Sequence, residues 1–413
     1  MPQETPPQFR GRRIGRRASV VAFASALIAL AAIATAGAAP TDPPPLTILT
    51  PTTTFGNDDI FVTPTGGTST YAKGPEILDS QGKVVWFHAI PQGQTAADFR
   101  TQTYRGKQVL TWWQGTGLGG LAHGTDYIYD DEYNQIATVE AGNDLSADGH
   151  EFLITPWNTA LILAYTTATA DLSSIGGPAN QTVINGVVQE IDIPTGRVLF
   201  EWNSADHVPF SQSEQPLPAS ASTPWDWFHI NAVHLDTDGS LLIDARNTWT
   251  AYKVNRHTGA ILWQLGGKAS TFTLAAARGQ VLDNANELFA WQHDIEGLGH
   301  DLYTVFDNES TGVAQLPYSR AITVQLDEKA KTATLVASDA QPEGLSAASQ
   351  GNAQTTSAGD VFVGWGSLPY ISAFSPTGSL IFDARFPTGV NTYRAYLLPW
   401  TPHKPGGSPP RHE

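Results

Sequence analysis

One hairpin unit recurs along this 413-residue chain and limits the folds that it can adopt. In each copy a short β-type run leads through a polar turn to a second run, which ends on an aromatic or large apolar residue in most copies. The clear copies are residues 78–86, 191–200 and 254–263, and the weaker copies are residues 128–136, 324–335 and 374–382. They follow one another at intervals of about 45 to 70 residues, a spacing typical of propeller blades lengthened by loops.

A second hairpin unit lies between the copies of the first. A polar residue begins its first strand, and a turn then leads to a strongly apolar strand, as in residues 150–163, 231–243, 293–305 and 352–363. Two hairpins per period make a four-stranded blade, so the sequence predicts an all-β fold with a six-bladed β-propeller over residues 71–402. A pair of β-sandwiches is the alternative. Only residues 271–278, which are rich in alanine, indicate a helix, of one or two turns.

The first 38 residues are predicted to form an export signal. A cluster of arginines over residues 10–17 precedes the uncharged apolar run 18–39, in which Ala36-Gly37-Ala38 has the pattern of a cleavage site. The run is also long enough to span a bilayer, so an uncleaved membrane anchor is the alternative. The two adjacent arginine pairs fit a twin-arginine signal as well as Sec export. We expect an exported protein (secreted, periplasmic or in the cell envelope), with residues 39–70 forming a Pro/Thr-rich lead and an entry strand and residues 403–413 forming a flexible tail.

Charge and composition exclude several classes of function. The formal net charge of -16 disfavours binding to nucleic acid or to anionic membranes. Cysteine is absent, which excludes disulfides, zinc–thiolate sites, iron–sulfur clusters and thiol nucleophiles. Any nucleophile must therefore be His, Ser, Thr, Tyr, Lys or a carboxylate.

Polar residues open the inner strands of several predicted blades, and such strand ends point into a common funnel. These residues are His150, His229, Asn231, His293 and Asn352. In His229-Ile230-Asn231, the period of two places both polar side chains on one face. Arg246 ends strand 241–246, so a hairpin returns it toward His229. Other histidines fall at predicted loops or strand ends, where structural or solvated positions are expected: His88, His123, His207, His234, His257, His300 and His403.

Two kinds of occupant suit such a funnel. Three imidazoles are suitable ligands for zinc or copper. Arg246 argues against a metal, because a fixed cation repels a divalent ion. An anion is the simpler occupant, since arginine, asparagine and protonated histidine all donate hydrogen bonds to it. One neutral histidine then remains as a nucleophile for covalent group transfer.

Longer motifs around these residues resemble the arylsulfotransferase superfamily of exported propellers. The central match is Asp226-Trp227-Phe228-His229-Ile230-Asn231-Ala232-Val233, followed by residues 241–248. Further matches are residues 98–100, 148–152, 263–268, 289–294, 363–366 and 393–400. Together the matches run from about residue 70 to residue 401, and they look most like the shorter, arylsulfotransferase-like branch. The separate N-terminal β-domain and the disulfide of the family's periplasmic enzymes have no counterpart in this sequence.

The resemblance implies a PAPS-independent transfer of a sulfuryl group from an aryl sulfate ester to a phenol, through a sulfohistidine intermediate and without a cofactor. Carried over by motif, His293 would be the nucleophile. The residues that would bind and polarise the sulfuryl oxygens are His150, His229, Asn231 and Arg246. Trp227, Phe228 and Trp291 lie near these motifs and are candidates for binding aryl rings, with core packing as the alternative.

The fold alone permits other functions. A non-catalytic propeller would bind an anionic or aromatic ligand, or a partner protein, in the same funnel. A quinone- or metal-dependent oxidoreductase is disfavoured because few carboxylates occur among the funnel candidates.

Overall fold

A computed structural model describes residues 40–67, 70–117, 121–310 and 316–403, whose regular structure is almost entirely β-strand. The predicted export signal and most of the predicted tail lie outside the described residues. Within those ranges the helices are α1 (Ser204–His207) and the short 3-10 helices η1 (Ser173–Ile175), η2 (Phe210–Gln212) and η3 (Arg246–Thr248). None of them has the length and apolar character that a bilayer crossing requires.

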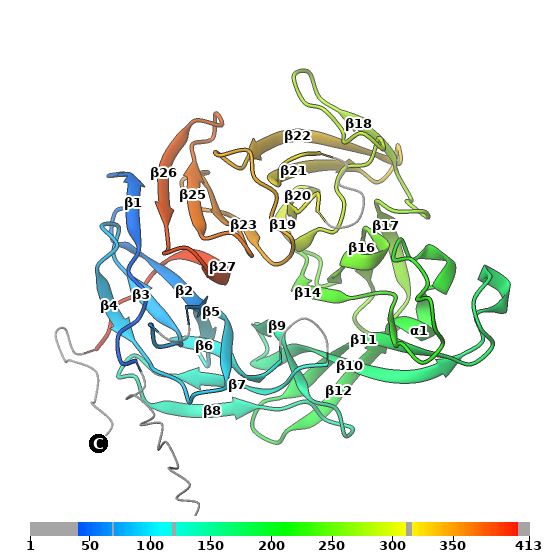
Figure 1. The fold of residues 1–413 in the computed structure, drawn as a ribbon, viewed down its shortest axis with the longest axis horizontal. Helices are drawn as coiled ribbons and strands as arrows, with labels where there is room; N and C mark the ends of the chain where they lie inside the picture. The colour runs from blue at the N-terminus through cyan, green and yellow to red at the C-terminus, as the bar shows by residue number, and fades with distance from the viewer. Residues whose placement is uncertain (1–39, 68–69, 118–120, 311–315, 404–413) are drawn as a thin grey trace, which may run out of the picture. The chain divides into compact units, whose positions relative to one another are not determined.

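The strands pair into five sheets arranged around a common centre (Figure 1). The first sheet contains β27 (Val390–Pro399), β2 (Asp58–Gly66), β3 (Glu76–Leu78) and β4 (Val84–Phe87). The second has nine strands: β5 (Thr95–Tyr104), β6 (Lys107–Thr116), β7 (His123–Tyr129), β8 (Gln135–Val139), β9 (Ala147–Ile154), β10 (Thr159–Ala170), β11 (Gln181–Asp192), β12 (Arg197–Asn203) and β13 (Trp225–Asp226).

The other three sheets have four or five strands each. The third contains β14 (Ile230–Leu235), β15 (Leu241–Ala245), β16 (Thr250–Val254) and β17 (Ile261–Leu265). The fourth contains β19 (His293–Gly299), β20 (Leu302–Asp307), β21 (Arg320–Asp327), β22 (Thr332–Ala340) and β18 (Thr273–Ala276). The fifth contains β23 (Asn352–Thr355), β24 (Val361–Gly364), β25 (Tyr370–Phe374), β26 (Leu380–Arg385) and β1 (Thr47–Thr50).

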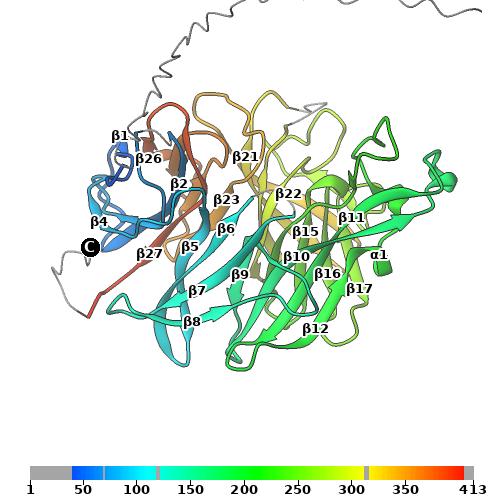
Figure 2. The same ribbon diagram turned by 60° about the horizontal axis from the view of Figure 1, so that its bottom comes forward.

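The inner strands form a closed ring of neighbours in the order β27, β5, β9, β14, β19 and β23, and β23 contacts β27 again. This is the arrangement of a β-propeller. Four of the sheets have the four or five strands of a blade, whereas β5 to β12 lie in one broad sheet (Figure 2) because Gly124 on β7 pairs with Ala147 on β9. The predicted six separate blades are therefore corrected to five hydrogen-bonded sheets.

Both ends of the described chain close the ring. Strand β1 pairs with β26, so Ile48 lies opposite Ala384, and β2 pairs with the last strand, β27, so Val62 lies opposite Ala395. The described propeller thus includes β1 and β2, which lie within residues 39–70, where a lead and an entry strand were expected. Each terminal strand of the described chain is therefore paired with a strand from the other end of the chain.

The predicted helix over residues 271–278 is wrong. Residues 273–276 of this segment form β18, which pairs in parallel with β22 from Thr273↔Thr332 to Ala276↔Leu335. The open edge of β22 offers backbone hydrogen bonds that outweigh the weak helical preference of the alanines.

The core consists of apolar layers between neighbouring sheets. One layer lies between the nine-stranded sheet and the β14–β17 sheet and includes Leu161, Trp202, Phe228 and Ile243. Each sheet therefore buries both faces, which explains why the strands carry continuous apolar runs.

The inner strands are irregular where they approach the centre. The pairing shifts between Ala97 and Arg100, Asp148 and Phe152, Ile230 and Ala232, His293 and Glu296, and Thr392 and Ala395. A bulge lets neighbouring side chains turn the same way instead of alternating. Asp98 and Asp294, in two of these bulges, have φ angles of 53° and 60°, a left-handed conformation that is uncommon for residues with side chains.

Asn352 joins the fifth sheet to the first, and its replacement by alanine should destabilise the ring. Its side-chain nitrogen donates to the Ala395 carbonyl (2.8 Å), and its oxygen accepts from the Ala395 N–H (3.0 Å), both in the protein interior. Asn352→Ala leaves these backbone groups unpaired, so we expect the free energy of unfolding to fall by about 2 to 4 kcal/mol, measured by urea denaturation.

Gln354 is the matched control. It makes the same two contacts with Leu397, at 3.0 and 2.8 Å, but it is half-buried, so water can replace them. Gln354→Ala should cost less than about 1 kcal/mol. Equal losses for the two variants would show that burial of this contact does not stabilise the closure.

Candidate functional site

The structure brings the three predicted histidines into one cluster. His150 lies in β9, His229 directly precedes β14, and His293 is the first residue of β19. The ring centroids of His150 and His229 are 5.3 Å apart, and the rings are nearly perpendicular. His293 is close enough to both that their charges affect its pKa. Residues from three inner strands therefore share one site.

Two of these histidines each have an aspartate partner at Nδ1. The Asp148 carboxylate pairs with His150 Nδ1, and the Asp226 carboxylate pairs with His229 Nδ1. A carboxylate in this position fixes the tautomer and stabilises the imidazolium. His150 and His229 are thus suited to carry positive charge and to accept or return a proton at Nε2.

His293 has a different environment, because neutral groups contact both of its ring nitrogens. Its Nδ1 lies 2.7 Å from Asn308 Oδ1, and its Nε2 lies 3.1 Å from the backbone nitrogen of Gln350. These two contacts assign the proton to Nδ1 and leave Nε2 as the acceptor. Burial, and then the charges of Arg246 and the neighbouring imidazoles, holds the pKa of His293 well below its usual range. His293 is therefore neutral at pH 7.

Arg246 supplies a cation beside the histidines. It begins η3, directly after β15, and its guanidinium carbon lies 4.9 Å from the ring centroid of Trp291. Its NH1 donates to Asn247 Oδ1 (2.9 Å) and its NH2 to the Ala348 carbonyl (3.4 Å). Burial lowers the pKa of Arg246, and nearby Asp226 opposes this effect. An arginine side chain keeps its charge in such an environment.

Two indole donors lie next to Arg246. Trp291 packs edge-to-face against Trp249, with ring centroids 5.3 Å apart. The Nε1 atom of each is buried and has no hydrogen-bond partner among the described residues. Buried donors without partners are uncommon, so a ligand rich in acceptor oxygens would suit this corner of the site.

The other two aromatic candidates lie in the core. Trp227 is fully buried, donates from Nε1 to Asn185 Oδ1 (2.9 Å) and contacts Phe210, with ring centroids 4.8 Å apart. Phe228 is fully buried in the same apolar cluster. These contacts give both side chains a packing role, which corrects the prediction that they bind an aryl ring.

Asn231 lies near the cluster but does not share a face with His229. The bulge between Ile230 and Ala232 interrupts the period of two, and the Asn231 side-chain nitrogen donates to the Gln292 carbonyl (2.8 Å). Asn231 thus holds the peptide that precedes His293. Asn352 likewise forms its hydrogen bonds with the backbone of Ala395 and not with a residue of the histidine cluster.

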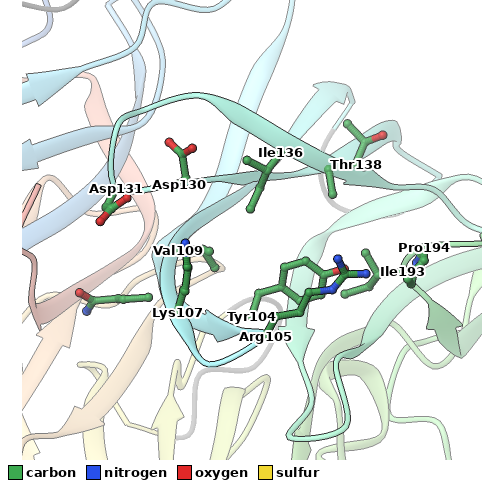
Figure 3. A pocket seen from close by; sticks show the side chains of 12 residues that line it. Tyr104, Arg105, Lys107, Val109, Asp130, Asp131, Ile136, Thr138, Ile193 and Pro194 are labelled. Carbon is green, nitrogen blue, oxygen red and sulfur yellow. The ribbon is translucent and has the colours of Figure 1, made fainter. Parts of the chain in front are cut away.

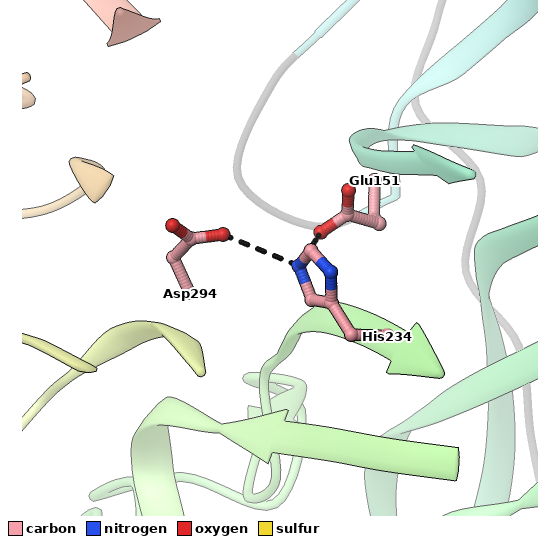
Figure 4. A group of neighbouring side chains, drawn as sticks. All are labelled: Glu151, His234 and Asp294. Carbon is pink, nitrogen blue, oxygen red and sulfur yellow. Dashed lines mark ion pairs between the residues drawn. The ribbon is translucent and has the colours of Figure 1, made fainter. Parts of the chain in front are cut away.

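Buried charged residues form a layer next to the histidines, on the inner strands β5, β9, β14, β19 and β27. The layer consists of Asp98, Arg100, Glu151, His234, Asp294 and Arg394. His234 Nε2 lies 3.1 Å from Glu151 Oε2 and 3.4 Å from Asp294 Oδ1 (Figure 4). Burial opposes its protonation, yet Glu151 and Asp294 raise the pKa of His234 to about 10, so it is charged at neutral pH.

His234 was expected at a loop or strand end, in a structural or solvated position. It is the second-last residue of β14 and is buried with two ionic partners. The centre also contains carboxylates that the strand pattern did not predict, because bulges turn them inward.

Glu151, His234 and Asp294 also offer three ligand atoms that lie within 4.8 Å of one another. A metal ion is disfavoured at this group because Arg394 NH1 lies 2.8 Å from Glu151 Oε2 and 3.2 Å from Asp294 Oδ1. A guanidinium bound to these oxygens repels a second cation. The donor set therefore fits an ion-pair network better than a metal centre.

A cavity of about 550 Å³ lies away from these residues, between the β5–β6 turn and β8 (Figure 3). Its lining includes Tyr104, Lys107, Asp130, Ile136 and Ile193, and no predicted site residue. We therefore place the candidate site at the histidine cluster.

Three partners of the histidines were not predicted from the sequence. Asp148 and Asp226 stand two and three residues before His150 and His229, and this spacing was a usable signal. Asn308 lies 15 residues from His293, and only the fold brings the two together.

Comparisons with known proteins identify the family. The family model described as arylsulfotransferase (ASST) matches residues 100–387, more than half of the 413-residue chain. No curated protein matches the chain.

Solved structures share the general arrangement at low similarity. A protein of unknown function from Bacteroides caccae is 10% identical over 83% of this chain and 99% of its own, with a TM-score of 0.48. An inactive virginiamycin B lyase from Staphylococcus aureus, solved with quinupristin, is 9% identical over 82% and 87%, with a TM-score of 0.41. The Cps50 (Swd1) β-propeller domain from Myceliophteria thermophila is 12% identical over 84% and 87%, with a TM-score of 0.38.

These structural similarities are too weak to support an argument about function. The match of the family model extends over most of the propeller and includes all three site histidines and Arg246. The chain therefore belongs to the arylsulfotransferase (ASST) family.

Proposed function

We propose that this protein is an exported arylsulfotransferase that moves a sulfuryl group from an aryl sulfate ester to a phenol through a sulfohistidine at His293. One observation carries the proposal. Of three clustered histidines, two have aspartate partners and can hold a proton, whereas His293 has Asn308 and remains neutral. A neutral imidazole between positively charged neighbours is the arrangement that nucleophilic attack on an anionic ester requires.

In the first half-reaction, His293 Nε2 attacks the sulfur atom and the bond between sulfur and the aryl oxygen breaks. The phenolate leaves with the bonding electron pair and takes a proton from His150 or His229. Arg246 and the protonated histidines stabilise the negative charge on the sulfuryl oxygens. The unpaired indole N–H groups of Trp249 and Trp291 are further donors beside Arg246.

In the second half-reaction, a phenol enters the site that the first product has left. The histidine that gave up its proton now accepts the phenolic proton at Nε2, while the phenol oxygen attacks sulfur. The bond between sulfur and His293 Nε2 then breaks, and its electron pair returns to the imidazole. The site returns to its starting protonation state.

The Gln350 N–H must leave His293 Nε2 before the attack. A backbone hydrogen bond of this kind contributes only about 0.5 to 1.5 kcal/mol. Its loss is small beside the barrier reductions that enzymes achieve.

Replacing the nucleophile should abolish turnover. With 4-nitrophenyl sulfate as donor and phenol as acceptor, we expect His293→Asn to lower the rate of nitrophenolate release by at least about 10³-fold, because the covalent route is lost. The exposed His257 is the matched control, and His257→Asn should keep the wild-type rate. Full turnover by His293→Asn would refute the mechanism, and a wild-type protein silent with every aryl donor would favour a binding propeller.

The partner of His293 should set the pH dependence. In the wild type the pKa of His293 is depressed, so loss of its nucleophilic form should not limit the rate between pH 6 and pH 8. Asn308→Asp places a carboxylate at Nδ1 and raises that pKa, so more of the imidazole is protonated and non-nucleophilic at low pH. Relative to the wild type, we expect Asn308→Asp to lose about tenfold more kcat/KM at pH 6 than at pH 8.

The same variant also loses the Asn308 donor to the carbonyls of Ala347 and Gln350. This structural effect does not depend on the protonation of His293. An equal loss at both pH values would therefore refute the prediction about the nucleophile.

The export part of the proposal rests on residues 1–38, with the basic segment and the Ala36-Gly37-Ala38 pattern. We expect the protein recovered from the periplasm or medium to begin at Ala39, as N-terminal sequencing would show. A membrane-bound protein that retains residues 1–38 would contradict cleavage.

A further inference from the structure

We propose that Arg394 is a positioning residue for sulfuryl transfer, which aligns the site histidines by binding the residues next to them in the chain. This inference rests on the proposed function. Arg394 does not contact the histidine rings in the structure; it acts through its partners.

The Arg394 guanidinium binds residues from four other inner strands. Its NH1 lies 2.8 Å from Glu151 Oε2 on β9, 3.2 Å from Asp294 Oδ1 on β19 and 3.4 Å from Asp98 Oδ1 on β5. Its NH2 donates to the Asn231 carbonyl on β14 (3.1 Å). Arg394 itself lies on β27, so one side chain connects five of the strands that form the ring.

Three of these partners are close neighbours of site histidines in the sequence. Glu151 follows His150, and Asp294 follows His293. Asn231 stands two residues after His229 and also holds the Gln292 peptide, directly before His293. In a regular strand a residue and its neighbour face opposite ways, but the bulges in β9 and β19 let both turn toward the centre.

Tyr393 adds a second contact from the same segment. Its hydroxyl donates to the His150 carbonyl (3.1 Å), and the side chain is fully buried. The dipeptide Tyr393-Arg394 therefore contacts the backbone of His150 directly and the neighbours of all three histidines.

Electrostatics makes this arrangement sensitive to the identity of residue 394. Burial opposes the ionisation of Glu151, yet Arg394, Arg100 and His234 together hold its pKa well below the usual range. The cations that face the acidic groups of the layer from neighbouring strands are these same three. Without the guanidinium, Glu151 and Asp294 would repel each other, and the residues attached to them would move.

Lysine at this position keeps the charge but not the geometry. An ammonium group is a compact donor, whereas the planar guanidinium reaches the carboxylates and the Asn231 carbonyl at once. Displacements of about 1 Å in a catalytic group can lower a rate by about 10²-fold. Arg394→Lys should therefore reduce the single-turnover rate of His293 sulfurylation by about 10²-fold, while KM for the donor changes less than about threefold.

Arg256→Lys is a control for the loss of a partly buried arginine pair. Arg256 binds Glu190 through Nε at 2.7 Å, outside the ring of inner strands. This variant should keep the wild-type sulfurylation rate. An Arg394→Lys variant that folds and transfers sulfuryl groups at the wild-type rate would overturn the proposal.

A second pair of variants covers the case in which Arg394→Lys does not fold. Asp294 and Asp98 are both fully buried and contact the same Arg394 nitrogen, but only Asp294 adjoins a site histidine. Positioning predicts that Asp294→Asn slows sulfurylation at least about fivefold more than Asp98→Asn. Equal effects would show that the layer only stabilises the fold.

A readout that needs no turnover separates this inference from the proposed function. The imidazole C–H signals of His150 and His293 can be followed by NMR and assigned through His150→Gln and His293→Asn. We expect Asp294→Asn to shift the His293 signals and Asp98→Asn to leave them unchanged. If the His293 signals shift in this way but the wild-type protein is inactive with every donor, the positioning role is retained and sulfuryl transfer is rejected. If Asp294→Asn leaves the His293 signals unshifted, the positioning role is overturned, whether or not the protein is active.

Discussion

A buried guanidinium at the centre of the ring is the interaction on which the rest of this structure depends. Arg394 lies on the last strand, which also closes the propeller by pairing with β2. Arg394 forms ion pairs with residues on β5, β9 and β19 and a hydrogen bond with β14. One segment therefore both closes the propeller and connects its inner strands. Acidic groups buried together would repel one another without it, and the layer is stable because Arg394, Arg100 and His234 balance their charge.

The chemistry of the site follows from how each histidine is partnered. The imidazoles of His150, His229 and His293 are identical as groups, yet an aspartate supports the imidazolium form of two of them, whereas Asn308 and burial favour the neutral form of His293. This difference in partners separates acid–base roles from the nucleophilic role. Arg246, beside Trp291, completes a site that favours an anionic ligand.

The sequence allowed the β-propeller and the polar cluster to be predicted, because strand alternation and repeated turns are local signals. It did not allow the details that depend on contacts between distant residues. Pairing of Gly124 with Ala147 merges strands that were expected in separate blades, and the edge of β22 converts an alanine-rich segment into β18. Bulges also break the period of two on which the position of Asn231 was predicted. Trp227 and Phe228 follow the general tendency of aromatic residues near a motif to pack in the core.

We propose that His293 carries the sulfuryl group between donor and acceptor. Mass spectrometry of the peptide that contains His293 tests this role, after the protein is mixed with an aryl sulfate in the absence of a phenol. We expect a mass gain of one sulfuryl group on His293, which disappears when phenol is added. Release of the donor's phenolate without this adduct, or an adduct on His150 or His229 instead, would show that His293 is not the nucleophile.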